Sequence, residues 1–359
     1  MVGRRDVERD VALTDDTVFR LYSMTKPITC VALLTLVEEG LIALDDPVAK
    51  YIPEWAGLGV FAAGVGPYLT TPPSRPMQVV DLMRHTSGLT YGFQNRTNVD
   101  AAYRKLGIAD MHGQDDLEGM IQQLAKLPLE FSPGEAWNYS VSTDVVGYLA
   151  QKVAGKPLDQ VFRERIFEPL GMSETGFHVR DDQQARFAAC YNAMPGGKMK
   201  LQDDPSKSQY LAPPKLYGGG GGLVGTAHDY LKFATILTNG GELDGARILA
   251  PKTVELMASN HLPGGQDLTQ LSRSLFSEST NAGVGFGLGV AVVFDAPQTL
   301  IPCSNGEFYW GGAASTAFWC DPVEDITAVF MTQLLPSSSY PIRRELRTLV
   351  YSALMETNG

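Results

Sequence analysis

Three β-rich runs near the C-terminus constrain the fold more than any other feature of the sequence. They are 285–295 (GFGLGVAVVFD), 313–320 (AASTAFWC) and 325–332 (DITAVFMT), and Pro, Gly or Asp bounds each of them. Short connections between such runs favour antiparallel neighbours over crossovers through a helix. A helix is predicted to follow at about 342–355, because its apolar residues recur at helical spacing. We therefore expect an antiparallel sheet followed by a terminal helix.

The middle of the chain has a different pattern. Helical periodicity is found at 78–83, 117–127, 142–153 and 158–167, between loops rich in Pro and Gly at 70–76 and 205–222. This block lies between an N-terminal helix and the predicted sheet. The pattern predicts an α+β fold in which helices flank an antiparallel sheet and a mostly helical domain is inserted. Residues 1–60 and 223–359 would form the α/β lobe and 61–222 the helical lobe, with a small-molecule site in the cleft between them.

Composition limits the partners. The 359 residues include 44% hydrophobic and 19% charged residues, which is enough apolar material for a core and too little charge for disorder. The net charge of -11 gives no electrostatic reason to bind nucleic acid or an anionic membrane. The first twenty residues hold no apolar signal region, and Glu38, Glu39 and Gly40 interrupt the longest apolar stretch, 28–44. We expect a cytoplasmic protein with a small-molecule partner; the oligomeric state, homo-oligomer included, stays open.

Several common sites are absent from the sequence. It contains no G-x-S-x-G, no H-E-x-x-H and no C-x-x-C, so no metal is expected, and no cofactor either. Residues 220–225 (GGGLVG) do match G-x-G-x-x-G. A dinucleotide site requires a buried strand directly before the first glycine, whereas Pro213 and Pro214 precede this one. A flexible or tightly turned loop is the better interpretation.

The remaining candidate is Ser23-Met24-Thr25-Lys26, an S-x-x-K. Pro27 is best tolerated in the first turn of a helix, so the helix that follows should begin near Ser23. Ser23 and Lys26 then share one face, and a desolvated lysine releases its proton more easily. Lys26 would thus activate Ser23 as a nucleophile. The alternative on these residues alone is a helix-capping serine beside a solvated lysine.

Two further segments favour the catalytic interpretation. They are 131–139 (FSPGEAWNY), followed by a helix, and 309–314 (YWGGAA), which is expected to open a strand. This order resembles that of the serine penicillin-recognising enzymes. In detail the chain resembles the family VIII carboxylesterases, which have the class C β-lactamase or transpeptidase-like fold. The resemblance extends over almost the whole chain and includes the following segments: TVFRLYSMTKPIT (17–29), LDDPVAKYIPEW (44–55), LMRHTSGLTYG (82–92), EPLGMSETGF (168–177) and GGGGGLVGTAHDYLKF (218–233).

The resemblance implies roles for individual residues. Ser23 would be the acyl-accepting nucleophile, Lys26 its proton partner and Tyr139 the tyrosine of the proton relay. Backbone N–H groups of Ser23 and Ala313 would form the oxyanion hole. The side chains and backbone expected to contact substrate are those of Trp310, Gly311, Gly312, Tyr91 and Phe318.

The resemblance also implies an activity. We expect a serine carboxylesterase that cleaves short-chain acyl esters through an acyl-enzyme. Trp310 stands where β-lactamases carry a lysine, and Val141 where they carry an asparagine, which favours neutral esters over carboxylate-bearing β-lactams. The alternatives are β-lactam or D-amino-acid peptide hydrolysis, acyl transfer to another alcohol, and a non-enzymatic penicillin-recognition module. Family members usually have several dozen residues before the matching segment, so we expect 4–13 to add a single strand to a shortened sheet.

Overall fold

The computed structural model describes residues 1–274 and 282–358. Its centre is a five-stranded antiparallel sheet in the order β11-β12-β13-β14-β15. The strands are β11 (Val284–Phe286), β12 (Ala291–Val293), β13 (Phe308–Gly311), β14 (Ala317–Asp321) and β15 (Ile326–Phe330). The antiparallel sheet near the C-terminus is thus confirmed, and so is the terminal helix α12 (Ile342–Ser352).

Details of the predicted strands were wrong. Run 285–295 is not one strand but the hairpin β11–β12, because the chain turns at Gly289, whose φ is +91°. The segment YWGGAA does not open a strand: it ends β13, and β14 begins only at Ala317. β13 itself, at 308–311, lies outside the three predicted runs.

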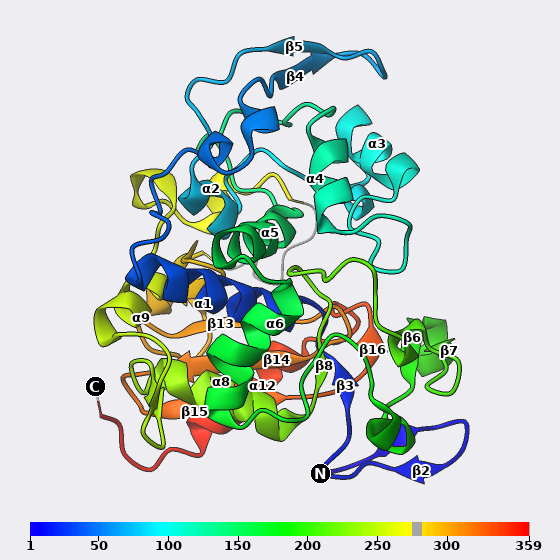
Figure 1. Cartoon of the computed structure of the whole chain (residues 1–359). Coiled ribbons are helices and arrows are strands. Elements are labelled where there is room, and N and C mark those ends of the chain that lie inside the picture. Colours follow the sequence, from blue (N-terminus) through cyan, green and yellow to red (C-terminus); the bar gives the residue numbers. More distant parts are fainter. Residues whose placement is uncertain (275–281, 359) are drawn as a thin grey trace.

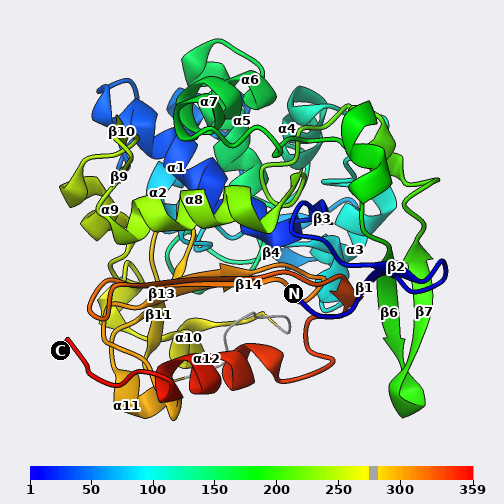
Figure 2. The same ribbon diagram turned by 90° about the horizontal axis from the view of Figure 1, so that it is seen from below.

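Helices cover both faces of this sheet (Figure 2). α1 (Thr25–Glu38) and α8 (Ala227–Thr238) lie on one face, and α12 lies on the other. Every residue of α1 from 25 to 36 is buried, since α1 is sandwiched between the sheet side and the helical part of the chain. The N-terminal end of α1 therefore lies at the junction of the two halves of the molecule (Figure 1).

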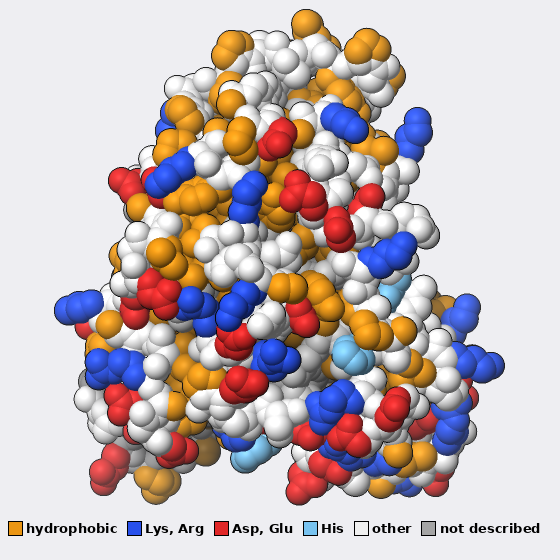
Figure 3. All heavy atoms as spheres, viewed as in Figure 1, with side chains coloured by type: hydrophobic (Ala, Val, Ile, Leu, Met, Phe, Trp, Pro, Cys, Tyr) orange, Lys and Arg blue, Asp and Glu red, His pale blue; other side chains and the backbone are white. Residues whose placement is uncertain are grey.

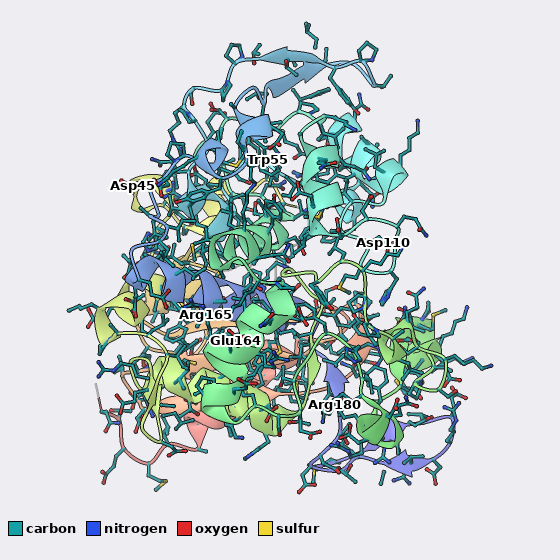
Figure 4. The ribbon with its side chains drawn as sticks, in the orientation of Figure 1. Asp45, Trp55, Asp110, Glu164, Arg165 and Arg180 are labelled. Carbon is teal, nitrogen blue, oxygen red and sulfur yellow. The ribbon has the colours of Figure 1, made fainter. Side chains whose placement is uncertain are left out.

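The middle of the chain is mostly helical, as predicted. It contains α2 (Val79–Met83), α3 (Asn98–Leu106), α4 (Leu117–Leu124), α5 (Ser142–Ala154), α6 (Leu158–Phe162) and α7 (Glu168–Leu170). α5 packs directly on α1. A π-helical turn, Arg163–Phe167, follows α6; its Arg165, labelled in Figure 4, pairs with Glu39 at 2.7 Å just beyond the end of α1. Trp55, also labelled there, donates from Nε1 to the carbonyl of Ile121 and ties the 53–55 segment to α4.

Smaller strands surround these two parts. They are β3 (Phe19–Arg20) with β8 (Val224–Gly225), β4 (Val60–Ala63) with β5 (Leu69–Thr71), and β9 (Glu242–Leu243) with β10 (Ala246–Arg247). Short helices α9 (Pro251–Met257), α10 (Leu268–Leu271) and α11 (Ala296–Thr299) complete the described chain. None of the helices in the described part of the chain is long and apolar enough to cross a membrane. Figure 3 shows acidic and basic side chains interspersed over one face.

The N-terminal segment differs from the prediction. Residues 4–13 do not add a strand to the main sheet but form a hairpin of their own, β1 (Arg4–Asp6) with β2 (Val11–Ala12). The hairpin is attached through the Ala189 N–H, which donates to the carbonyl of Arg5, so it lies beside β6 (Cys190–Met194) and β7 (Lys198–Asp203). β6 in turn pairs in parallel with β16 (Leu334–Leu335), which links the middle of the chain to its C-terminal part. The division at 60/61 and 222/223 stays a prediction.

Candidate active site

The structure brings Ser23, Lys26 and Tyr139 together. Ser23 lies in a 3-10 turn, Tyr22–Met24, that leads into α1, and Lys26 follows in the first turn of the helix. Lys26 Nζ donates to Ser23 Oγ at 3.2 Å, and the Tyr139 hydroxyl donates to the same oxygen at 2.6 Å. Tyr139 directly precedes the residues that lead into α5, the helix packed on α1. Contact between these two helices therefore aligns the three side chains.

The backbone before Ser23 is held in an uncommon conformation. Tyr22 has φ +47°, a left-handed value that typically costs a non-glycine residue about 1–3 kcal/mol and persists only where its surroundings enforce it. Two residues earlier the backbone is held by Gln333, whose Oε1 accepts from the N–H of Arg20 and whose Nε2 donates to the Arg20 carbonyl. The Arg20 side chain is buried and ion-paired with Asp203 at 2.5 Å. The contacts of Arg20 with Gln333 and Asp203 thus hold the segment that leads to Ser23.

Lys26 is buried in surroundings that disfavour its charge. Its Nζ also donates to the carbonyl of Gly220 at 2.6 Å and lies 4.5 Å from the ring centroid of Tyr139. Desolvation lowers the pKa of Lys26 from 10.5 to about 7, partly opposed by the carboxylate of Asp144. A neutral Lys26 is therefore well populated near pH 7 and can take the Ser23 proton. Burial raises the pKa of Tyr139, so its hydroxyl keeps its proton at neutral pH.

Asp144 is a member of this cluster that sequence reasoning missed. It lies in the first turn of α5, is buried, and accepts at Oδ1 from the N–H of Gly220 at 2.8 Å. Burial raises its pKa despite the nearby Lys26 cation. In the sequence it is indistinguishable from an acidic residue near a helix N-terminus, and only the fold shows that it faces Lys26 through Gly220.

The glycine-rich run 218–222 is a tightly packed loop against this cluster. None of these glycines has a left-handed φ, so glycine is needed here because a larger side chain would not fit. A Cβ on Gly220 would lie 2.5 Å from Asp144 Oδ2 and 2.7 Å from the Tyr91 hydroxyl. A Cβ on Gly219 would lie 2.8 Å from a backbone carbonyl of α5. The close approach lets the Gly220 carbonyl reach Lys26.

The predicted substrate-contacting residues lie in two different surroundings. The ring of Trp310, at the end of β13, lies 5.6 Å from that of Tyr139, and Tyr91 lies 5.3 Å from Tyr139 on another side. Gly311 and Gly312 follow Trp310 into the turn that contains Ala313, and a Cβ on Gly312 would lie 2.5 Å from the carbonyl of Leu21. Trp310 and Phe318 are both fully buried, but the ring of Phe318 packs against Tyr230 of α8.

Aromatic side chains surround the ring of Tyr139. The described rings next to it are those of His85, Trp137, Tyr91, Trp310 and Phe93. Phe93 stacks on Tyr91 at 4.6 Å and is 52% exposed, so it extends this aromatic surface toward solvent.

Comparison with known proteins places the chain in a family. The family model described as "Beta-lactamase" matches residues 1–352. The chain belongs to the β-lactamase family. Within the family it is 36% identical to protein Rv1367c of Mycobacterium tuberculosis over 342 residues, covering 94% of this chain and 82% of that protein. It is 30% identical to esterase EstB of Burkholderia gladioli over 370 residues, covering 98% and 86%.

A solved structure gives the same result. EstCE1, described as a hydrolase with promiscuous acyltransferase activity, is 28% identical and superposes with a TM-score of 0.80. The match covers 97% of this chain and 88% of EstCE1. The resemblance to family VIII esterases and the β-lactamase-like fold are thereby confirmed. The chain is a serine hydrolase of the β-lactamase fold, with an esterase among its relatives.

Proposed function

We propose that this β-lactamase family member is a carboxylesterase that hydrolyses short-chain acyl esters through an acyl-enzyme on Ser23. The observation that carries the proposal is the double contact of Ser23 Oγ with Lys26 Nζ, at 3.2 Å, and with the Tyr139 hydroxyl, at 2.6 Å. One partner can accept a proton and the other can donate one. A serine between an acceptor and a donor is equipped for acyl transfer.

The first half-reaction forms the acyl-enzyme. Neutral Lys26 removes the proton from Ser23 as Oγ attacks the ester carbonyl. The oxyanion that forms is stabilised by the backbone N–H groups of Ser23 and Ala313, a type of donor whose loss typically costs about 3 kcal/mol. When the tetrahedral intermediate collapses, the C–O bond to the alcohol breaks. The alcohol leaves with the proton of Tyr139, and protonated Lys26 restores that proton to the phenolate.

The second half-reaction hydrolyses the acyl-enzyme. Lys26, neutral again, accepts a proton from water as the water oxygen attacks the acyl carbonyl. Ser23 Oγ then leaves with a proton from Tyr139, the carboxylic acid is released, and Lys26 reprotonates Tyr139. If an alcohol replaces water, the same steps give acyl transfer, the second candidate, which is favoured by the described activity of EstCE1.

The aromatic surface supports the choice of substrate. Trp310 and Tyr91 place apolar rings beside Tyr139, and apolar surroundings suit an uncharged acyl or alkoxy group. The similarity to EstB supports esters over amides as the substrate class. Hydrolysis of β-lactams or D-amino-acid peptides and a non-catalytic penicillin-recognition module are the remaining alternatives.

A paired assay tests the proposal. Steady-state release from p-nitrophenyl butyrate and from nitrocefin would be followed for the wild type and for Ser23→Ala, with melting temperatures measured for both. We expect ester turnover well above nitrocefin turnover, lost in Ser23→Ala without a change in melting temperature. A fully active Ser23→Ala protein would refute the mechanism. A single burst of one equivalent without steady state would instead indicate a recognition module.

A further inference from the structure

Arg343 is a charged residue of the terminal helix whose side chain reaches the turn after Trp310. From the first turn of α12, its Nη2 donates to the carbonyl of Gly312 at 2.9 Å and to that of Thr316 at 2.8 Å. The turn is closed by two bonds of its own, from the Gly312 N–H to the Thr316 carbonyl and from the Ser315 N–H to the Gly312 carbonyl. Both carbonyls that close the turn therefore also accept from the guanidinium.

The turn is built to fit this guanidinium. A Cβ on Gly311 would lie 2.8 Å from the backbone carbonyl of Thr316 and would also collide with the Arg343 guanidinium, so glycine is required there for space. On the other side, Gly312 packs against the carbonyl of Leu21, two residues before Ser23. Ser315, with φ +67°, donates from its hydroxyl to the carbonyl of Leu334. The turn is thus clamped between the nucleophile segment and the cation.

Attachment of α12 does not account for this arrangement. Arg347, one helical turn later, already joins the helix to the sheet through an ion pair with Glu307 at 2.8 Å, and Tyr351 donates to Glu307 and Asp321. The Arg343 side chain is partly buried, and this burial together with the Arg347 cation lowers its pKa to about 10, which leaves it charged at neutral pH. Removing a cation even partly from water is costly, so the use of this guanidinium on two backbone carbonyls invites a functional explanation.

The chemistry of the peptide group supplies that explanation. The carbonyl of Gly312 and the N–H of Ala313 belong to one amide. A cation bound at the carbonyl oxygen draws electron density from the nitrogen and makes the N–H a stronger donor, as in any chain of hydrogen bonds that polarise one another. The same bond fixes the plane of that amide, and therefore the direction of its N–H.

We propose that Arg343 is a positioning residue for ester hydrolysis, which orients and polarises the Gly312–Ala313 peptide so that the Ala313 N–H stabilises the oxyanion formed on Ser23. The proposal rests on the esterase function above and deepens it. The proposal also predicts which kinetic constant changes. Because the charge develops only in the tetrahedral intermediate, loss of Arg343 should lower kcat and leave KM nearly unchanged.

The experiment compares Arg343→Met and Arg343→Lys with the matched control Arg344→Met. Arg344 is the next residue on α12, exposed, and donates to the distant carbonyl of Leu300. Three quantities would be measured: kcat and KM for p-nitrophenyl butyrate, the inhibition constant of butylboronic acid, and the melting temperature. The boronic acid forms a tetrahedral anion on Ser23 and reports oxyanion stabilisation without turnover.

For Arg343→Met we expect about a 10- to 100-fold loss in kcat, a similar loss in boronate affinity and a KM within threefold of wild type. Arg343→Lys should recover part of both losses, and Arg344→Met should match wild type. Unchanged kcat, or a lower kcat with unchanged boronate affinity, in either Arg343 variant would overturn the proposal. If Arg343→Met does not fold, Arg343→Lys gives the same two readouts. A wild type without ester turnover would instead refute the proposed function.

Discussion

Replacing the buried Lys26 by methionine should stabilise the folded protein while it abolishes ester turnover. Methionine is similar in length to lysine, has no charge and suits an apolar site. The pKa of Lys26 is 10.5 in an unfolded chain and about 7 in the folded protein. Between these two values the unfolded chain binds the proton more tightly. Protonation therefore favours unfolding, and the free energy of unfolding of the wild type rises with pH through this window.

The magnitude follows from the two pKa values. Relative to its value at high pH, the free energy of unfolding of the wild type is lower by about 5 kcal/mol at pH 6 and by about 2 kcal/mol at pH 9, because of the lowered pKa of Lys26. The methionine variant has no such cost. It does leave the Gly220 carbonyl without the Lys26 donor, which costs about 1–3 kcal/mol at any pH. We therefore expect Lys26→Met to be more stable by about 2–4 kcal/mol at pH 6, with that advantage about 3 kcal/mol smaller at pH 9.

Urea denaturation at pH 6 and pH 9 would test this expectation. The pair to compare is the wild type and Lys26→Met, and the same comparison in an Asp144→Asn background separates the contribution of the Asp144 carboxyl, the second buried group near Lys26. The change in advantage between the two pH values is the decisive quantity, since lost hydrogen bonds contribute equally at both. An advantage that is the same at pH 6 and pH 9, or that grows with pH, would refute the idea that Lys26 is buried with a lowered pKa.

Two further variants test the proton relay. Asp144→Asn should move the acidic limb of the pH profile of kcat/KM below its wild-type position near pH 7, because the carboxylate raises the pKa of Lys26 and the amide does not. Asparagine keeps an acceptor for the Gly220 N–H. An acidic limb at the wild-type pH would therefore show that Asp144 does not act on Lys26. Tyr139→Phe should lose roughly 100-fold or more in kcat with little change in melting temperature, because the ring packing is retained and only the proton donor to Ser23 is removed. Wild-type turnover would exclude Tyr139 from the mechanism.

Periodicity and turn chemistry predicted much of the fold, and its errors have local causes. The hairpin at 285–295 was read as one strand because both of its arms are apolar and buried, so nothing marks the turn except Gly287 and Gly289. The role of 4–13 was misjudged because pairing partners cannot be found from one segment alone. Its hairpin lies near β6, almost two hundred residues later, and β6 pairs with β16 at the far end of the chain.

Some residues of the candidate site could likewise be predicted from the sequence, and others could not. Ser23 and Lys26 are three residues apart on one turn, so a short motif contains their relation, and Tyr139 was found through the family resemblance. Asp144 and Arg343 have no such signature. Asp144 acts across the Gly220 amide, and Arg343 binds backbone carbonyls, which any sequence can supply. Contacts with backbone groups do not depend on residue type, so they produce no sequence motif apart from the glycines that make room for them.

Arg343 also changes what Trp310 implies about substrate charge. From the sequence alone, tryptophan in place of lysine removes a cation from this edge of the site. In the structure the Arg343 guanidinium lies directly beside Gly311, although it comes from a helix more than thirty residues later and is covered by the turn it binds. Its donors at Nη2 are engaged with Gly312 and Thr316 carbonyls. A preference for neutral esters would therefore arise from the bulk of the Trp310 ring and from the commitment of the local cation to the backbone, rather than from a lack of positive charge.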